Sequence, residues 1–342
     1  MTLLDQCRTA ALACPARLVF PDSLDARSVR AAFYLAEAGY AQPVLLGNPF
    51  EMRAFCHQEH LPLGRVPMID PQTSARLPAY IAALAERMPG KSEEELAALL
   101  KDPLWFAGAM LMAGDVDCVV GGNHSPTSNV LRAALRVVGL AEGNKTVSSI
   151  FFMLPPDDGQ PLVFTDCGVV PHPTPAQLSD IAISAADSYR RVTGLEPHIA
   201  MLSFSTLGSA RHASVDAVRE ATRLVRERRP DLSVDGELQF DAAMVPEVAA
   251  QKAKDSPVAG RANVLVFPSL EAGNIGYKIA QRMGAYTALG PMIQGLCLPY
   301  HDLSRGCTAE DMVQVSLLAM KMAPSGDARS QPDLAVAGLT RS

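Results

Sequence analysis

Short apolar runs alternate with longer segments of helical periodicity along most of this chain, and this alternation limits the folds open to it more than any other feature. The apolar runs include "RLVF" at 17–20, "PVLL" at 43–46, "DCVVGG" at 117–122 and "NVLVFP" at 263–268. The segments 25–40 and 214–228 place apolar residues three and four positions apart. Strands that alternate with helices in this way form βαβ units, in which neighbouring strands are parallel. The sequence therefore predicts an α/β fold with mainly parallel sheets.

The length of the chain favours two domains over one. A chain of 342 residues with 48% hydrophobic content can bury a large core, and about ten apolar runs are too many strands for one small sheet. We predict a discontinuous first domain at 1–144 and 295–342, with a second domain inserted at 145–294. In open α/β sheets, ligands bind beyond the carboxyl ends of the strands. We therefore expect the functional residues on strand-to-helix loops, in a cleft between the two domains.

Charge and cysteine usage exclude several classes of protein. The formal net charge of −6, with no extended basic face, disfavours nucleic-acid binding. The seven cysteines form no CxxC pair, which indicates a reducing, cytoplasmic environment. Asp5 and Arg8 interrupt any apolar signal core, and no run is long enough to span a membrane. Leu3, Leu4 and Cys7 fall at helical spacing and predict a short amphipathic helix.

The loop "GGNHSPTSNVLR" (121–132) follows a buried strand and opens a helix. Its glycines permit close approach, Asn123, Ser125 and Ser128 are polar, and Arg132 lies one turn further on. Backbone N–H groups at a helix start suit a phosphate or another oxyanion. The serines would serve equally well as helix caps, and Arg132 as a solvated surface residue. Both alternatives stay open at this point.

Two further polar loops follow predicted strands in the second half of the chain. "LSFSTLGSARH" (202–212) repeats the pattern of glycine with hydroxyl side chains. "FPSLEAGNIGYKIAQRMG" (267–284) ends a strand with a glycine-containing turn and opens a helix that carries Tyr277 and Lys278. Gly273 and Gly276 alone are weak support for a nucleotide-binding fingerprint. Three such loops together indicate a ligand site.

The stretch "HDLSRGCT" (301–308) is the fourth polar loop. Thr308 with Asp311 three residues later matches a capping box, which makes Asp311 a helix-start carboxylate. This assignment leaves Ser304 and Arg305 unexplained. An arginine directly before a helix N-terminus opposes the helix dipole, so it indicates an anionic ligand or developing negative charge.

Four segments together closely resemble one enzyme family: "DGELQFDAA" (235–243), "SPVAGRANVLVFPSLEAGNIGYKIAQR" (256–282), "GPMIQGL" (290–296) and "HDLSRGC" (301–307). They resemble the phosphate acetyltransferases, transferases that interconvert acetyl-CoA plus phosphate with acetyl phosphate plus CoA. The resemblance extends over nearly the whole chain. "NHSPTSNVLRA" (123–133) and "SFSTLGSARH" (203–212) are most similar to the ethanolamine-utilization branch.

The resemblance implies a fold and a set of roles. The fold would be two α/β/α domains with an interdomain cleft, like the isocitrate and isopropylmalate dehydrogenases, assembled as a homodimer. The catalytic serine and arginine fall on Ser304 and Arg305, and the proposed base falls on Asp311. An arginine that binds CoA falls on Arg132, and a second falls near Arg87. The remaining candidates for substrate contact are Asn123, Ser125, Ser128, Tyr277 and Lys278.

By the same resemblance, acyl transfer needs no metal and no tightly bound cofactor, because CoA and acetyl-CoA are substrates. The protein would be cytoplasmic, and the ethanolamine branch adds a bacterial microcompartment as a further location. The metal-dependent dehydrogenases of similar architecture are disfavoured, because Asp231, Asp235 and Asp241 read as turn and surface residues rather than as metal ligands. A phosphate butyryltransferase-like acyltransferase and a non-enzymatic two-lobed small-molecule binder remain as alternatives.

Overall fold

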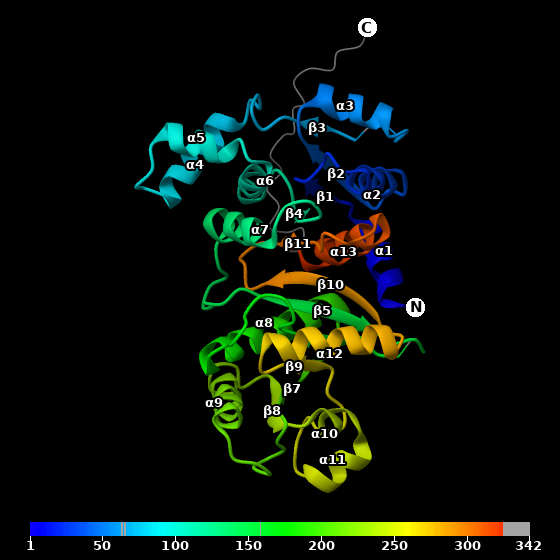
Figure 1. Ribbon diagram of the computed structural model, residues 1–342, viewed down its shortest axis with the longest axis vertical. Helices are drawn as coiled ribbons and strands as arrows, with labels where there is room; N and C mark the ends of the chain where they lie inside the picture. The colour runs from blue at the N-terminus through cyan, green and yellow to red at the C-terminus, as the bar shows by residue number, and fades with distance from the viewer. Residues whose placement is uncertain (63, 65, 158, 324–342) are drawn as a thin grey trace. The chain divides into compact units, whose positions relative to one another are not determined.

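The computed structural model describes residues 1–62, 64, 66–157 and 159–323 (Figure 1). The chain divides into two compact units. The flanking unit comprises Ala10–Gly139, Leu298–Tyr300 and Arg305–Ser342, and the central unit comprises Met1–Thr9, Leu140–Cys297 and His301–Ser304. The domain boundaries expected at 144 and 295 stay a prediction, and each unit is described by itself below.

The flanking unit is built on a five-stranded sheet with the order β11-β4-β1-β2-β3. Its strands are β1 (Ala16–Phe20), β2 (Ala41–Leu46), β3 (Met68–Ile69), β4 (Cys118–Gly121) and β11 (Tyr300–Asp302). Its helices are α2 (Ala26–Glu37), α3 (Pro49–Gln58), α4 (Leu77–Arg87), α5 (Glu93–Leu100), α6 (Pro103–Met112), α7 (Thr127–Ala133), the π-helix η1 (Ala134–Val138) and α13 (Ala309–Met322). The strand β1 pairs in parallel with both β2 and β4.

The pairing of β1 with β4 decides where the loops that follow these two strands begin. Because parallel neighbours end at the same edge of a sheet, the loops that leave Phe20 and Gly121 start side by side. They are closely packed: a Cβ on Gly121 would lie 2.6 Å from Pro21 Cγ, so only glycine fits there. The helix α13 packs against α2, β1 and β4, which brings its N-terminus into the same unit as both loops.

The central unit contains a six-stranded sheet with the order β10-β5-β6-β9-β7-β8. Its strands are β5 (Ser148–Leu154), β6 (Leu162–Thr165), β7 (His198–Leu202), β8 (Ser233–Leu238), β9 (Val264–Val266) and β10 (Thr287–Gln294). Its helices are α8 (Pro175–Thr193), α9 (Ala213–Arg228), α10 (Phe240–Met244), α11 (Pro246–Lys252) and α12 (Leu270–Met283). Its core includes Phe151, Phe164 and Phe267.

The prediction of mainly parallel sheets is correct only in part. The strands β6, β9, β7 and β8 are parallel, but β5 is antiparallel to both β6 and β10. Residues 155–161 between β5 and β6 are too few for a crossover helix, so these strands form a hairpin. The protein is therefore an α/β fold with mixed and parallel sheets.

Two other expectations have clear outcomes. The N-terminal helix is confirmed as α1 (Leu3–Ala13), with Leu3 and Cys7 buried. The assignment of Asp235 to the surface is wrong: its side chain is buried and accepts a hydrogen bond from Arg226 Nη2 at 2.5 Å. The described part of the chain contains no group of three or more His, Cys, Asp or Glu side chains placed to hold a metal ion.

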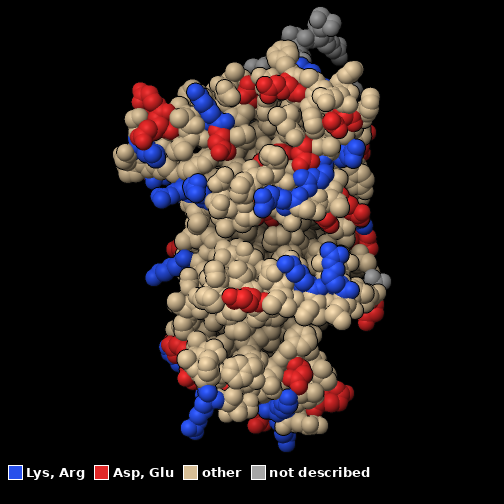
Figure 2. Space-filling view, viewed as in Figure 1, with Lys and Arg blue, Asp and Glu red and all other residues tan. Residues whose placement is uncertain are grey.

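On the face drawn in Figure 2, lysine and arginine side chains are interspersed with aspartate and glutamate. Among the residues that the structure describes, no helix combines the length and the apolar composition needed to cross a bilayer.

Candidate active site

Three loops of the flanking unit are joined by hydrogen bonds: residues 21–25 after β1, residues 122–126 after β4, and residues 305–308 before α13. The Asp22 carboxylate organises the second of these loops. Its Oδ2 accepts hydrogen bonds from the N–H groups of Gly122, His124 and Ser125, at 2.8, 3.3 and 3.1 Å. Its Oδ1 accepts from Ser125 Oγ at 2.6 Å. The conformation of the 122–125 loop therefore depends on a side chain about 100 residues earlier in the chain.

Asp25 of the first loop and Asn123 of the second loop are joined by a hydrogen bond between their side chains. Asp25 caps α2 by accepting from the Arg27 N–H at 2.8 Å, and its Oδ2 also accepts from Asn123 Nδ2 at 3.1 Å. Burial raises the pKa of the Asp25 carboxyl, but hydrogen bonds from Arg27 and Asn123 outweigh it and leave the pKa below its ordinary value. Asn123 is 2% exposed, and its Nδ2 lies 3.1 Å from Ser28 Oγ as well. Its amide thus holds the loop together, and a substrate contact through this side chain stays a prediction.

The predicted catalytic pair lies where the loop before α13 begins, with Ser304 directly before the loop and Arg305 as its first residue. Ser304 and Arg305 are consecutive, and both are exposed. The guanidinium of Arg305 makes no hydrogen bond or ion pair with any described residue, whereas its carbonyl oxygen accepts a hydrogen bond from Arg27 at 2.8 Å. The side chain is therefore available to a ligand while its main chain is anchored.

The capping box predicted from Thr308 and Asp311 is confirmed. Asp311 Oδ2 accepts from the Thr308 N–H at 2.8 Å, and Thr308 Oγ1 accepts from the Asp311 N–H at 3.1 Å. Asp311 is exposed, so one carboxylate oxygen serves as a cap while the carboxyl group as a whole faces solvent. Cys307, directly before Thr308, is largely buried. Burial raises the pKa of its thiol, although the nearby cation Arg27 acts in the opposite direction.

The two arginines expected to bind CoA lie on two different helices of the flanking unit, α7 and α4. Arg132 is exposed on α7 and approaches Asn129 Oδ1 at 3.5 Å. Arg87 is the last residue of α4, and its Nη2 donates to the carbonyl oxygen of Val138 at 2.8 Å. Gly139 leaves room for this contact, since a Cβ there would lie 2.8 Å from Arg87 Nη2. Arg87 is thus held against η1, the helix that directly continues the one carrying Arg132.

The serines of the 121–132 loop are not helix caps. The N-cap of α7 is Pro126, which has no side-chain cap hydrogen bond. Ser125 is half-buried against Asp22, and Ser128 is exposed in the first turn of α7. The alternative reading of these residues as caps is therefore wrong.

Tyr277 and Lys278 lie on α12 in the central unit. The Tyr277 ring stacks on Phe151 with centroids 4.2 Å apart, and Lys278 Nζ donates to Asn274 Oδ1 at 2.8 Å. Packing explains the glycine at the start of this helix, because a Cβ on Gly273 would lie 2.4 Å from the carbonyl oxygen of Asp166. Helix packing therefore accounts for Gly273 without a nucleotide-binding fingerprint.

The polar loop at 202–212 is held by a buried acid. Glu237, which is 1% exposed, accepts from Ser205 Oγ and from the Gly208 N–H, both at 2.8 Å. Arg219 lies 3.5 Å from the same carboxylate. The hydroxyl of Ser205 is thus used to fix the loop.

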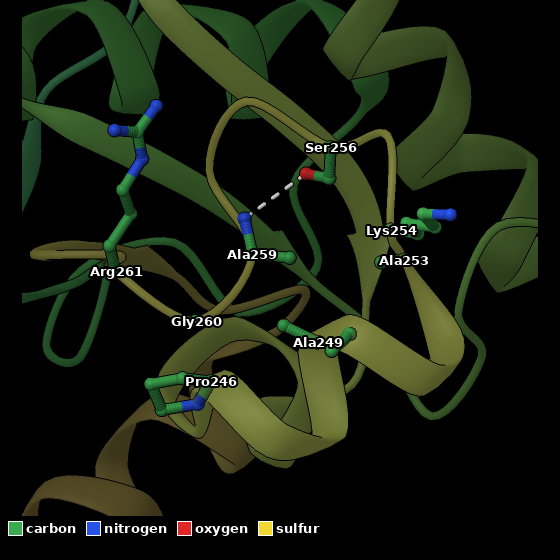
Figure 3. Close-up of a pocket in the computed structure, with 9 residues that line it drawn as sticks. Pro246, Ala249, Ala253, Lys254, Ser256, Ala259, Gly260 and Arg261 are labelled. Carbon is green, nitrogen blue, oxygen red and sulfur yellow. Dashed lines mark hydrogen bonds between the residues drawn. The ribbon is translucent and has the colours of Figure 1, made fainter.

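A hollow of about 310 Å³ lies in the central unit beside α11 (Figure 3). Its wall is mostly alanine, proline and glycine. Figure 3 shows Lys254 and Arg261 extending to opposite sides rather than toward each other, and Ser256 Oγ accepts from the Ala259 N–H at 3.1 Å. This hollow gathers no convergent reactive groups and is not the candidate active site.

Sequence reasoning missed Asp22, Asp25 and Arg27. An aspartate directly before a helical run is a capping signal, so Asp25 could have been found as the start of α2. Nothing local marks Asp22, because the partners of its carboxylate lie on the loop after β4. Arg27 has a local partner in Asp25, but the carbonyl groups that it binds lie on other loops of the same unit.

The comparisons with known proteins point to the same family. The family model described as "Phosphate acetyl/butaryl transferase" matches residues 2–320. The phosphate acetyltransferase of Acetivibrio thermocellus is 42% identical over 324 residues, which cover 93% of this chain and 97% of that protein. The solved structure titled EutD phosphotransacetylase from Staphylococcus aureus is 38% identical, with a TM-score of 0.88, and the match covers 94% of this chain and 98% of that one. A phosphotransacetylase structure from Streptococcus pyogenes is 39% identical with a TM-score of 0.89, covering 94% and 97%.

Proposed function

The chain belongs to the Phosphate acetyl/butaryl transferase family and is a phosphate acetyltransferase, and we propose that the loop at 304–311 carries its chemistry. In the direction of acetyl-CoA synthesis, the sulfur of CoA attacks the carbonyl carbon of acetyl phosphate. The C–S bond forms, the C–O bond to phosphate breaks, and the thiol proton leaves to a base. The observation that supports this assignment best is Arg305, an exposed guanidinium that has no partner among the described residues and whose main chain is anchored.

Arg305 and Ser304 would stabilise the negative charge of the reaction. Acyl transfer between sulfur and oxygen passes through a tetrahedral intermediate whose carbonyl oxygen is an oxyanion. A guanidinium supplies charge-assisted hydrogen bonds to that oxygen or to the departing phosphate. Gly306, directly after Arg305, lets the backbone approach the substrate closely.

Asp311 would accept the thiol proton of CoA. Its carboxylate is exposed, and its second oxygen is not needed for the capping bond to Thr308, so a cap and a base can be the same residue. A thiol is a far weaker acid than a carboxylic acid, so a cation that stabilises the thiolate would favour the transfer. Arg305, six positions before Asp311 in the chain, is the nearest candidate in sequence.

CoA would be bound mainly through its phosphates. Arg132 and Arg87 are proposed to meet these groups, because arginine forms bidentate, charge-assisted pairs with phosphate. The remaining proposed substrate contacts are Asn123, Ser125, Ser128, Tyr277 and Lys278. These residues need neither a metal ion nor a tightly bound cofactor for acyl transfer, and CoA and acetyl-CoA act only as substrates.

We further propose the isocitrate dehydrogenase-like arrangement, with a cleft between two α/β/α domains, and a cytoplasmic homodimer. The name EutD, which belongs to the related Staphylococcus aureus protein, supports an ethanolamine-utilization role. That role would place some of the enzyme in a bacterial microcompartment. An exposed apolar stripe on α12, formed by Ile275, Ile279 and Met283, is a candidate surface for the dimer contact.

A comparison of acyl donors tests the proposed function. CoA release would be measured with acetyl-CoA plus phosphate and with butyryl-CoA plus phosphate, each over a range of concentrations. We expect a higher kcat/KM for acetyl-CoA. Preference for butyryl-CoA would favour the butyryltransferase alternative, and binding of CoA without turnover of either donor would favour a non-enzymatic binding protein.

A further inference from the structure

Arg27 joins three loops of the flanking unit through one guanidinium group. Its Nη1 donates to the carbonyl oxygens of Arg305 and Cys307, both at 2.8 Å. Its Nη2 donates to the carbonyl oxygen of Asn123 at 2.9 Å and to Asp25 Oδ2 at 2.6 Å. Its Nε donates to Asp25 Oδ1 at 3.0 Å. One side chain thus connects the loop after β1, the loop after β4 and the loop before α13.

These bonds occupy all the donors that Arg27 possesses. A guanidinium carries five N–H groups, and each of them has a protein acceptor here. None remains for a substrate. Arg305 is the opposite case, because its guanidinium has no partner among the described residues. The two arginines are therefore suited to different tasks: Arg27 holds structure, and Arg305 meets a ligand.

The position of Arg27 is costly for the helix that carries it. It lies in the first turn of α2, where the helix dipole disfavours a positive charge. The neighbouring carboxylate of Asp25, whose side chain is 13% exposed, compensates this charge. A lysine or a neutral residue would suit the helix as well, so the fork shape of arginine has to be explained by the loops that it binds.

We propose that Arg27 is a positioning residue that sets the orientation of Arg305 by fixing the main chain of residues 305–307. The two carbonyl groups that it holds lie on either side of Gly306, the residue with the greatest backbone freedom in the loop. Without both bonds, rotation at Gly306 would swing Arg305 away from its working position. This inference rests on the proposed role of Arg305 in acyl transfer.

The substitution Arg27→Lys tests the inference. A lysine ammonium is a single point of contact and cannot reach carbonyl groups on two loops together with Asp25. We expect kcat to fall by about 10- to 100-fold, because small misplacements of catalytic groups cause losses of this size. The KM for CoA should change little.

Arg17→Lys is the matched control for Arg27→Lys. Arg17 forms a comparable pair with Asp117 in the same unit, with a 2.8 Å contact and side chains that are 18% and 9% exposed. No hydrogen bond links it to residues 304–308. Both variants should lower the melting temperature, and only Arg27→Lys should lower kcat. Equal kcat in Arg27→Lys and wild type would overturn the inference.

A double-mutant cycle separates this inference from the proposed function. If Arg27 acts through Arg305, Arg27→Lys should cause no further loss of kcat in an Arg305→Ala background. An equal loss in both backgrounds would overturn the positioning role and leave the proposed function intact. A near-normal kcat in Arg305→Ala alone would instead overturn the proposed function. If Arg27→Lys does not fold, Arg27→Gln replaces it in the same cycle, because the shorter side chain with one NH2 group cannot hold the carbonyl groups of Arg305 and Cys307 together with Asp25 and Asn123.

Discussion

Asp311 has two proposed roles, and a set of three substitutions can separate them. As a cap, Asp311 accepts the Thr308 N–H at 2.8 Å and adds a negative charge to the first turn of α13. As a base, it removes the thiol proton of CoA. Asp311→Asn removes the charge, although the amide oxygen can still accept the Thr308 N–H. Thr308→Ala removes the reciprocal bond to the Asp311 N–H and leaves the carboxylate unchanged.

The magnitudes expected for the two roles differ widely. Loss of one charge at a helix N-terminus reduces the free energy of unfolding by about 0.3–1 kcal/mol, and loss of a threonine cap costs about 0.5–2 kcal/mol. Loss of a general base reduces the rate about 10²- to 10⁴-fold. Thr308→Ala should therefore lower stability and keep kcat, whereas Asp311→Asn should lower kcat by about 100-fold or more at neutral pH.

The pH dependence of the remaining rate provides a second signature of the base. An unperturbed thiol has a pKa of about 8.5, roughly 4.6 above that of an aspartic acid, so direct proton transfer costs about 6 kcal/mol. Without the carboxylate, the reaction depends on CoA that is already a thiolate, and this fraction rises about tenfold per pH unit below the thiol pKa. The kcat of Asp311→Asn should accordingly recover in part between neutral pH and about pH 8.5.

Glu310→Gln is the control for Asp311→Asn. Glu310 is exposed in the same first turn, and its Oε1 accepts from Gln314 Nε2 at 3.3 Å. The substitution removes a charge at the same end of α13 without touching the proposed base. The assay is the formation of acetyl-CoA from acetyl phosphate and CoA, with urea unfolding measured on the same preparations. If Asp311→Asn matched Glu310→Gln in kcat and in its pH profile, Asp311 would be a cap only.

Three further predictions concern charge and protonation. Arg305→Ala should lower kcat by about 10²- to 10³-fold, the usual cost of an oxyanion donor, without changing the urea midpoint, because its side chain is exposed; a near-normal kcat would remove it from the mechanism. Arg132→Ala should raise the KM for CoA more than it lowers kcat and leave the KM for acetyl phosphate nearly unchanged; loss of discrimination against dephospho-CoA would identify the 3′-phosphate as its partner, and an unchanged KM for CoA would return it to the solvated surface. Burial lowers the pKa of His301 to about 3, so between about pH 6.5 and pH 3 the unfolded chain binds a proton that the folded protein does not. As the pH is lowered through this range, the contribution of His301 should reduce the free energy of unfolding by up to about 1.4 kcal/mol per pH unit. In His301→Gln the free energy of unfolding should depend less steeply on pH; an identical dependence would refute the assignment of a low pKa to His301.

Local features of this protein could be predicted from the sequence alone. The alternation of apolar runs and helical segments predicted the α/β class, and Thr308 with Asp311 predicted the capping box at the start of α13. Both features depend on residues within a few positions of each other, so their physical causes, side-chain periodicity and short-range hydrogen bonding, are present in contiguous sequence.

The proposed catalytic loop was identified by resemblance, whereas the residues that hold it in place were not identified from the sequence. In the sequence, the capping box explained Thr308 and Asp311 but left Ser304 and Arg305 without a structural role. It offered no reason to connect Arg305 with Arg27, which is 278 positions earlier. Nor did it connect Asp22 with the loop that begins at Gly122.

Only the tertiary structure decided which distant segments became neighbours. The order β11-β4-β1-β2-β3 brings the ends of β1 and β4 together and thereby makes Asp22 an acceptor for the 122–125 loop. In the central unit, the hairpin of β5 and β6 replaced the expected parallel pairing, and Asp235 became buried beside Arg226. Periodicity determines which face of a strand or helix is apolar, but it does not specify which strand lies beside which. Strand order is set by how all the apolar faces can be buried together, and the contacts of Asp22 and Arg27 follow from that order.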